Sequence, residues 1–133
     1  MKLLLDTQCW LWMAAEPERF SSAARQRIQD VRNELYLSSV SAMEISIKYS
    51  IGKLLLHEPP AEFIPSLLHF GKVSVLPVGL AHAIRLAGLP FHHRDPFDRL
   101  LVAQAQVENL KIVTADDKFL KYDVEVLAAH EFG

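Results

Sequence analysis

The sequence predicts an α/β protein in which a central, mainly parallel sheet is flanked by helices. Short apolar runs alternate with longer amphipathic segments along the whole chain, which is the pattern of strand–helix–strand units. The chain has 133 residues, of which 50% are hydrophobic and 23% charged. Folding at this length buries about 68% of the unfolded surface, enough for one core without disulfides. We therefore expect residues 1–133 to form a single domain.

The chain begins with a strand and a helix. Residues 2–5 are an apolar run closed by Asp6, as expected of a strand buried on both faces, and residues 7–15 predict a helix. Trp10 and Trp12 lie about 200° apart on such a helix. We therefore expect one of them to face the core and the other to be free for a protein interface.

A second unit follows in residues 21–54. A serine cap and helical spacing of apolar residues predict an amphipathic helix over residues 21–32, and residues 34–38 predict a strand. Ser39 or Ser41 then caps a further helix. Its apolar stripe, which we expect to face the core, consists of Val40, Met43, Ile47, Ile51 and Leu54.

The rest of the chain continues the alternation. The elements expected there are helix 61–70, strand 73–78, helix 80–87, helix 96–109, strand 111–113 and strand 124–127. Pro65 interrupts the first of these helices, and Pro77 marks the end of its strand or an edge of the sheet. Gly88 stops the next helix. Helix 96–109 is apolar nearly all round, so we expect it to be central and buried.

Composition excludes several other classes of protein. The longest apolar run, residues 9–15, is far shorter than the roughly 18 residues that span a bilayer, and Asp6 interrupts the N-terminal leucines before a signal-peptide core can form. We therefore expect a cytoplasmic protein with no membrane partner. One cysteine cannot form an internal disulfide or a cysteine-based metal site. The net charge of −2 argues against binding of nucleic acid through bulk charge.

Two carboxylates are expected at one edge of the sheet. Asp6 directly follows the first strand and Asp116 follows strand 111–113. In open parallel sheets, ligands bind beyond the carboxyl ends of the strands. A carboxylate buried there needs a partner, which is either a helix N-terminus or arginine, or a cation. The two alternatives are evenly balanced on this pattern.

Further acids surround the starts of two helices. Asp95 suits the N-cap of helix 96–109, whereas Asp98 begins a helix so apolar that its side chain has few ways to avoid the interior. Arg99 suits an ion pair with Asp95 or a phosphate contact. Glu44 lies four residues before Lys48, which favours an exposed helical ion pair over a position at the rim of the core. The adjacent histidines His92 and His93 are expected in a polar loop.

An all-carboxylate cluster is the strongest chemistry that these acids could form. Its members would be Asp6, Glu44, Asp98 and Asp116. Such a cluster cannot stay ionised without cations, and a few hard oxygen ligands suit Mg²⁺ or Mn²⁺. The chemistry implied is phosphodiester hydrolysis.

Four motifs, in order, resemble a known family. They are Leu-Leu-Leu-Asp-Thr at 3–7, Ser-Ser-Val-Ser-Ala-Met-Glu-Ile at 38–45, the segment around Arg-Asp-Pro-Phe-Asp-Arg at 93–105, and Val-Thr-Ala-Asp at 113–116. Over essentially the whole chain they resemble the PIN domain of VapC-type toxins from type II toxin–antitoxin systems. The resemblance implies a PIN-like three-layer fold, an endoribonuclease dependent on Mg²⁺ or Mn²⁺, a cognate antitoxin that blocks the site, and a homodimer.

The resemblance also implies residue roles. The catalytic and metal-binding acids would be Asp6, Glu44, Asp98 and Asp116, which raises Glu44 from an ion pair to a site residue. Candidates for supporting or substrate contacts are Thr7, Asp95 and Arg99, and Asp117 competes with Asp116 for the fourth acid. Gln8 and Met43 depart from the His and Trp common in this subgroup, which affects the fit of the substrate more than metal binding.

The main hypothesis is therefore a metal-dependent endoribonuclease toxin that acts on RNA. One alternative is an aspartate-based phosphoryl enzyme or receiver-like domain, because an acid after the first strand also suits those folds. Such sites usually need a further acid nearby, whereas Thr7 and Gln8 follow Asp6. The other alternative is a non-catalytic α/β binding module whose acids only cap helices and pair with Arg or Lys.

Overall fold

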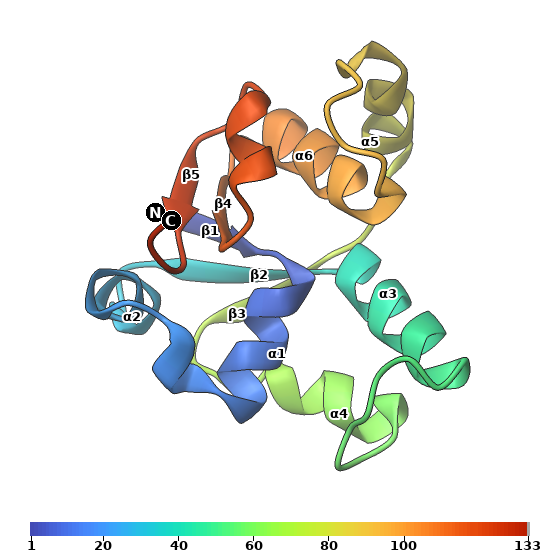
Figure 1. The fold of residues 1–133 in the computed structure, drawn as a ribbon. Helices are drawn as coiled ribbons and strands as arrows, with labels where there is room; N and C mark the ends of the chain where they lie inside the picture. The colour runs from blue at the N-terminus through green and yellow to red at the C-terminus, as the bar shows by residue number, and fades with distance from the viewer. Residues whose placement is uncertain (133) are drawn as a thin grey trace.

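Five parallel strands form the central sheet of the protein (Figure 1). The structure, a computed structural model, describes residues 1–132. Across the sheet the strands run in the order β3-β2-β1-β4-β5, and each neighbouring pair is parallel. Their bounds are β1 Lys2–Leu5, β2 Glu34–Ser38, β3 Val73–Leu76, β4 Lys111–Thr114 and β5 Val126–Ala128. The predicted α/β class with a parallel sheet is confirmed.

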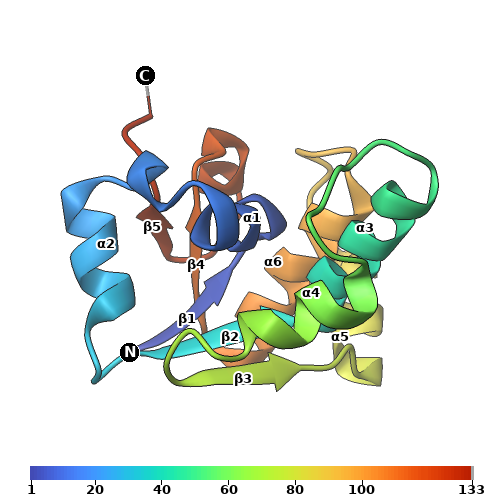
Figure 2. The ribbon, with the colours of Figure 1, turned by 90° about the horizontal axis from the view of Figure 1, so that it is seen from below.

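Helices cover both faces of this sheet, so the fold has three layers (Figure 2). Helices α1, α2 and α4 pack on one face and α5 and α6 on the other, while α3 continues directly from the end of β2. The helices are α1 Thr7–Ala15, α2 Ser22–Gln29, α3 Ser39–Ser50, α4 Pro60–Leu67, α5 Leu80–Arg85 and α6 Pro96–Glu108. Within residues 1–132, no helix is long and apolar enough to cross a membrane.

Strand β1 lies at the centre of the sheet and contributes side chains to the hydrophobic cores on both of its faces. Leu3 and Leu5 pack against α1 and α2, whereas Leu4 packs on the opposite face against α6. All three side chains are fully buried. The unbroken apolar run is thus explained by burial on both faces, as the sequence predicted.

The expectation for the two tryptophans was wrong. Trp10 is fully buried and Trp12 is only 7% exposed, and both belong to the same core. The chain folds back after α1, so that Phe20 meets Trp12 edge to face with ring centroids 5.5 Å apart. Because the chain continues over a second side of α1, both tryptophans can be buried in one core.

Helices α2 and α3 differ from their predicted end and predicted cap, respectively. Helix α2 ends at Gln29 and not near Arg32, because the Asp30 side chain accepts a hydrogen bond from the Arg32 backbone and forms a turn. Helix α3 is capped by Ser38, whose hydroxyl accepts a hydrogen bond from the Val40 backbone, and not by Ser39 or Ser41.

The apolar stripe of α3 does not face the core as expected. Val40 is buried, but Met43, Ile47 and Ile51 are 50%, 43% and 59% exposed. The inward side of the helix carries Ser41, Glu44 and Ile45 instead. A polar inner face is required because this side of α3 borders the acidic cavity described below.

Helix α6 is fixed by a buried polar contact near its middle. The Gln104 side chain is fully buried; its Oε1 accepts a hydrogen bond from Ser38 Oγ at 2.5 Å and its Nε2 donates to the Pro77 carbonyl at 3.3 Å. These bonds join α6 to the end of β2 and to the segment after β3. The expected burial on all sides is only partly confirmed, since Leu101 to Ala105 are buried but Val107 is 41% exposed.

Candidate active site

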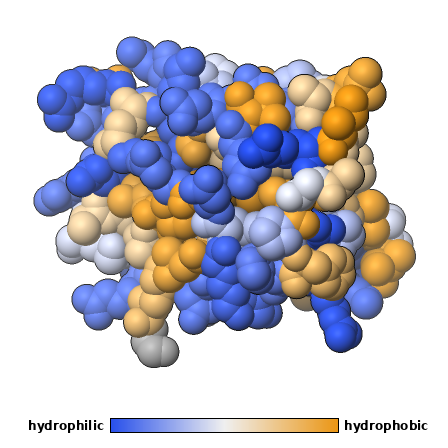
Figure 3. All heavy atoms as spheres, turned by 90° about the horizontal axis from the view of Figure 1, so that it is seen from above, coloured by the Kyte–Doolittle hydropathy of each residue, from blue (hydrophilic) through white to orange (hydrophobic). Residues whose placement is uncertain are grey.

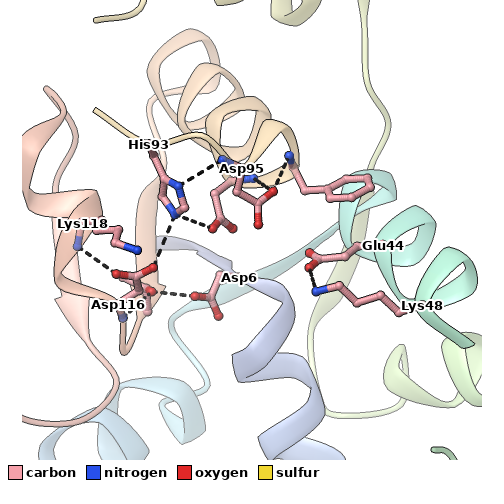
Figure 4. A network of polar contacts seen from close by, with 10 residues as sticks. Asp6, Glu44, Lys48, His93, Asp95, Asp116 and Lys118 are labelled. Carbon is pink, nitrogen blue, oxygen red and sulfur yellow. Dashed lines mark hydrogen bonds and ion pairs between the residues drawn. The ribbon is translucent and has the colours of Figure 1, made fainter. Parts of the chain in front are cut away.

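Four acids from four parts of the chain meet at the carboxyl edge of the sheet. Asp6 ends β1, Asp116 follows β4, Asp98 lies in the first turn of α6, and Glu44 lies in the second turn of α3. Strands β1 and β4 pair with Leu5 opposite Val113, which brings the residues after them together. In Figure 4 the labelled Asp6, Glu44 and Asp116 point towards a common space.

That space is a cavity of about 710 Å³. All four acids line it, together with Asp95, Asp117, Thr7, Lys48 and Lys53. The structure therefore brings the sequence-predicted acids into one cavity. Thr7 lies at its wall, where its hydroxyl donates to Ser41 Oγ at 3.0 Å and links α1 to α3.

Asp6 is held by hydrogen bonds on both carboxylate oxygens. Its Oδ1 accepts from the Cys9 backbone at 2.8 Å, which caps α1, and its Oδ2 accepts from Thr114 Oγ1 at 2.6 Å. Burial raises the pKa of Asp6, while the hydrogen bonds from Thr114 and Cys9 oppose that rise. The same Thr114 oxygen accepts from the Asp116 backbone at 3.0 Å, so one threonine orients both strand-end acids.

Glu44 combines both roles considered for it. Its Oε2 pairs with Lys48 Nζ at 2.5 Å, so the predicted i,i+4 ion pair is present. The pair is not an exposed one, because Glu44 is only 5% exposed. Its other oxygen, Oε1, is buried without a hydrogen-bond partner. A buried carboxylate oxygen without a donor is costly, and a cation in the cavity would satisfy it.

Asp98 is an acid of the site with a strongly raised pKa. Burial raises its pKa to about 8, and repulsion from Asp95, Asp6, Glu44 and Asp116 adds to the effect. Its side chain is 18% exposed. The Asp98 carboxyl is therefore mostly protonated at neutral pH in the metal-free protein, and a bound cation would favour its ionised form.

Asp95 and Arg99, the two other residues proposed near the start of α6, differ in their contacts. Asp95 caps α6 as predicted, since its Oδ1 accepts from the Phe97 backbone at 2.8 Å and the Asp98 backbone at 3.4 Å. Arg99 donates to the Leu89 carbonyl at 3.2 Å, and its guanidinium lies 4.9 Å from the centre of the Phe91 ring. Arg99 thus pairs with backbone and an aromatic ring, not with Asp95, and it does not line the cavity.

One residue of the site was missed in the sequence. His93 Nε2 lies 2.9 Å from Asp98 Oδ2 and 3.5 Å from Asp116 Oδ2, and its side chain is 12% exposed. The sequence placed it in a polar loop because adjacent histidines have no ligand spacing. Its position two residues before the helix cap was the one available signal.

The donor set suits a hard divalent cation. The oxygens available in the cavity are carboxylates, which Mg²⁺ and Mn²⁺ prefer together with water and phosphate. Glu44 Oε1, which has no hydrogen-bond partner, and the raised pKa of Asp98 both indicate that the acids are not fully balanced by the lysines of the cavity. By this test the residues fit such an ion.

A three-layer α/β fold with carboxylates at the ends of parallel strands defines the class to which PIN domains belong. A family model described as "PIN domain" matches residues 3–125. Ribonuclease VapC22 of Mycobacterium tuberculosis is 32% identical over 116 residues, which are 86% of each chain. The chain belongs to the PIN-domain family, among the VapC ribonuclease toxins. PIN ribonucleases are typically metal-dependent.

Other relatives agree with this assignment. Ribonuclease VapC16 of the same organism is 43% identical over 68 residues, so the chain spans about half of that relative, 48% of its length. VapBC2 from Rickettsia felis, solved with a DNA fragment from its promoter, matches with a TM-score of 0.72 at 16% identity, over 96% of this chain and 98% of the other. A toxin–antitoxin complex from Klebsiella pneumoniae matches with a TM-score of 0.62 at 15% identity, over 97% and 98%. These structures show the fold.

Proposed function

We propose that this protein is a metal-dependent endoribonuclease and the toxin of a toxin–antitoxin pair. The carrying observation is the convergence of Asp6, Glu44, Asp98 and Asp116 on one cavity where Asp98 has a pKa of about 8. The two alternatives are less well supported. Neither a receiver-like domain nor a plain binding module explains why four acids line one cavity.

Asp6 and Asp98 would hold the principal Mg²⁺ or Mn²⁺, and Glu44 and Asp116 would bind or orient a second ion or the attacking water. When bound, such an ion polarises a phosphoryl oxygen and lowers the pKa of water. The protein's own part is to fix the donors: Thr114 and the Cys9 backbone hold the Asp6 carboxylate. We assign the fourth acid to Asp116 over Asp117, because Asp116 Oδ2 is the one that faces His93 and Asp98.

Two lysines supply positive charge at the rim of the same cavity. Lys48 pairs with Glu44, and Lys53 lines the cavity close to the end of α3. RNA phosphates reaching the acids would pass these ammonium groups, which suit phosphate contacts. The protein's net charge of −2 makes such local contacts necessary for an RNA substrate.

Cleavage of RNA tests the proposed activity. With Mg²⁺ or Mn²⁺, the wild type should cleave a mixed RNA substrate, and Asp6→Asn should reduce the rate by more than about 100-fold, since partners of metal ligands alone are worth 10- to 100-fold. Asp123→Asn, which changes an exposed acid away from the cavity, is the matched control and should cleave normally. Equal cleavage by Asp6→Asn and wild type would exclude this mechanism.

A second groove of this protein lies beside the acids and suits docking of the antitoxin. A second cavity of about 550 Å³ between α1 and α4 shares Gln8, Leu11 and Leu54 with the acidic one. Its other walls are largely apolar and include Trp12, Leu55 and Phe63. We propose that an apolar segment of the antitoxin occupies this groove, because a chain lying there reaches the acids and can block them with a cationic side chain.

Leu55→Asp should therefore weaken the complex. Leu55 is 93% exposed, so the change costs little folding stability, but it places a charge in the groove. Co-expressed with the cognate antitoxin, this variant should lose most of the complex on size exclusion with light scattering, whereas Val31→Asp, which is exposed elsewhere, should not. Undiminished complex formation by Leu55→Asp would contradict this groove.

A second copy of this chain is the other partner that we propose. Exposed apolar side chains lie on α3, at Met43 and Ile47, and on α5, at Leu80 and Ile84. Figure 3 shows hydrophobic spheres among hydrophilic ones on one face of the molecule, with several at the right of the view. The light-scattering mass of the isolated protein should correspond to two chains, and a monomeric mass would refute the homodimer.

A further inference from the structure

His93 connects two acids that lie far apart in the sequence. Its Nε2 lies 2.9 Å from Asp98 Oδ2 on α6 and 3.5 Å from Asp116 Oδ2 after β4 (Figure 4). Candidate ligand atoms of these three residues all lie within 4.8 Å of one another. The imidazole is therefore close enough either to bind a cation together with the carboxylates or to hold the carboxylates from behind.

The other ring nitrogen decides between these roles. His93 Nδ1 accepts a hydrogen bond from the Asp95 backbone at 3.2 Å, so Nδ1 carries a lone pair. A neutral imidazole then has its proton on Nε2, the nitrogen that faces the two acids. A protonated Nε2 has no lone pair for a metal ion. Metal-bound histidines show the opposite pattern, in which the second nitrogen donates its proton.

The position of the ring agrees with this tautomer. Asp95, Asp98 and Asp116 line the acidic cavity, but His93 is not among its lining residues. The ring packs edge to face on Phe119, with the two ring centroids 6.4 Å apart. Nε2 makes no hydrogen bond of good geometry to either carboxylate, although it lies within ion-pair distance of both.

We propose that His93 is a positioning residue, whose Nε2–H draws the carboxylates of Asp98 and Asp116 together and turns them to receive one divalent cation. This inference rests on the proposed metal site and adds a nitrogen donor behind its carboxylates. Once a bound cation ionises both carboxylates, they repel each other, and His93 is the side chain that lies close to both of them. Without His93, the binding free energy of the cation alone would have to offset the repulsion between the Asp98 and Asp116 carboxylates.

Mn²⁺ binding to three variants tests this role. His93→Leu removes the donor, His93→Gln places an amide N–H at a similar reach, and His92→Leu changes the exposed neighbour that packs on Tyr122. By titration calorimetry, His93→Leu should weaken Mn²⁺ binding by about 10- to 100-fold, the range for partners of metal ligands. His93→Gln should recover most of the affinity, and His92→Leu should match the wild type.

Pulsed electron paramagnetic resonance of bound Mn²⁺ separates positioning from ligation. A positioning role predicts no ¹⁴N coupling from a directly bound imidazole in the wild type. Such a coupling, lost in His93→Gln, would overturn the inference, as would wild-type affinity in His93→Leu or no recovery in His93→Gln. If His93→Leu does not fold, the Gln variant and the spectrum still decide. Failure of the wild type to bind Mn²⁺ would instead refute the proposed function.

Discussion

Asp98→Asn should remove Mn²⁺ binding and RNA cleavage and, at the same time, make the metal-free protein more stable. The Asp98 carboxyl is largely withdrawn from water and lies among four other acids; desolvation first and repulsion second raise its pKa to about 8. A neutral amide of the same size removes this repulsion but also removes a ligand. We expect cleavage to fall by more than about 100-fold. In the presence of EDTA at pH 8, the Tm should rise by about 3 °C or more, the scale of 1 kcal/mol at this length.

Asp123→Asn is the control for these two effects, the loss of cleavage and the gain of metal-free stability. It removes one negative charge from an exposed position outside the cavity, so neither Tm nor cleavage should change appreciably. Thermal melts with and without Mn²⁺ give the stability, and a ligand that binds only the folded state must raise it. A lower Tm for metal-free Asp98→Asn, or an unchanged gain from Mn²⁺, would contradict an acid cluster that needs a cation.

The metal-free protein should lose stability as the pH rises from about 4 to about 8. The pKa of Asp98 rises from 3.8 to about 8 on folding. In this window the folded chain keeps the proton and the unfolded chain has lost it. Each pH unit then costs up to about 1.4 kcal/mol for one such group. Burial raises the pKa of Asp6 too, with the same sign, whereas Asp30, lowered to about 2, titrates below the window.

Urea unfolding in EDTA at several pH values measures this slope. Asp98→Asn should flatten it, because a group with a strongly raised pKa no longer titrates. Saturating Mn²⁺ should reverse the trend, since metal binding replaces the proton and strengthens as the carboxylates ionise. Rising stability between about pH 5 and 8 in the metal-free wild type would show that the acids do not repel one another in the folded protein.

The sheet and its strand-end acids were predictable because their causes are local. Residues 2–5 read as a doubly buried strand, and Leu3, Leu4 and Leu5 are buried on alternate faces. Given parallel strands, Asp6 and Asp116 must share an edge, which needs no tertiary information. Asp98 was recognisable because it starts an otherwise apolar helix. Capping chemistry likewise placed Asp95 correctly at the start of α6.

The features that the sequence did not predict depend on packing between segments that are distant in the chain. Helical spacing alone paired Glu44 with Lys48, but only the approach of α3 to α6 buries Glu44 at the cavity. Met43 and Ile47 suggested a core-facing stripe, and the acidic cavity on the other side of α3 turned them outwards. His93 carried no recognisable spacing, because its partners lie on α6 and beyond β4.

Crystals of the protein soaked with Mn²⁺ test the central claim most directly. An anomalous difference peak should appear in the acidic cavity, about 2.1 Å from carboxylate oxygens of Asp6 and Asp98 and close to Glu44 and Asp116. An ordered Mn²⁺ bound only elsewhere, or no peak in this cavity at millimolar metal, would contradict a four-carboxylate metal centre and the nuclease mechanism that depends on it.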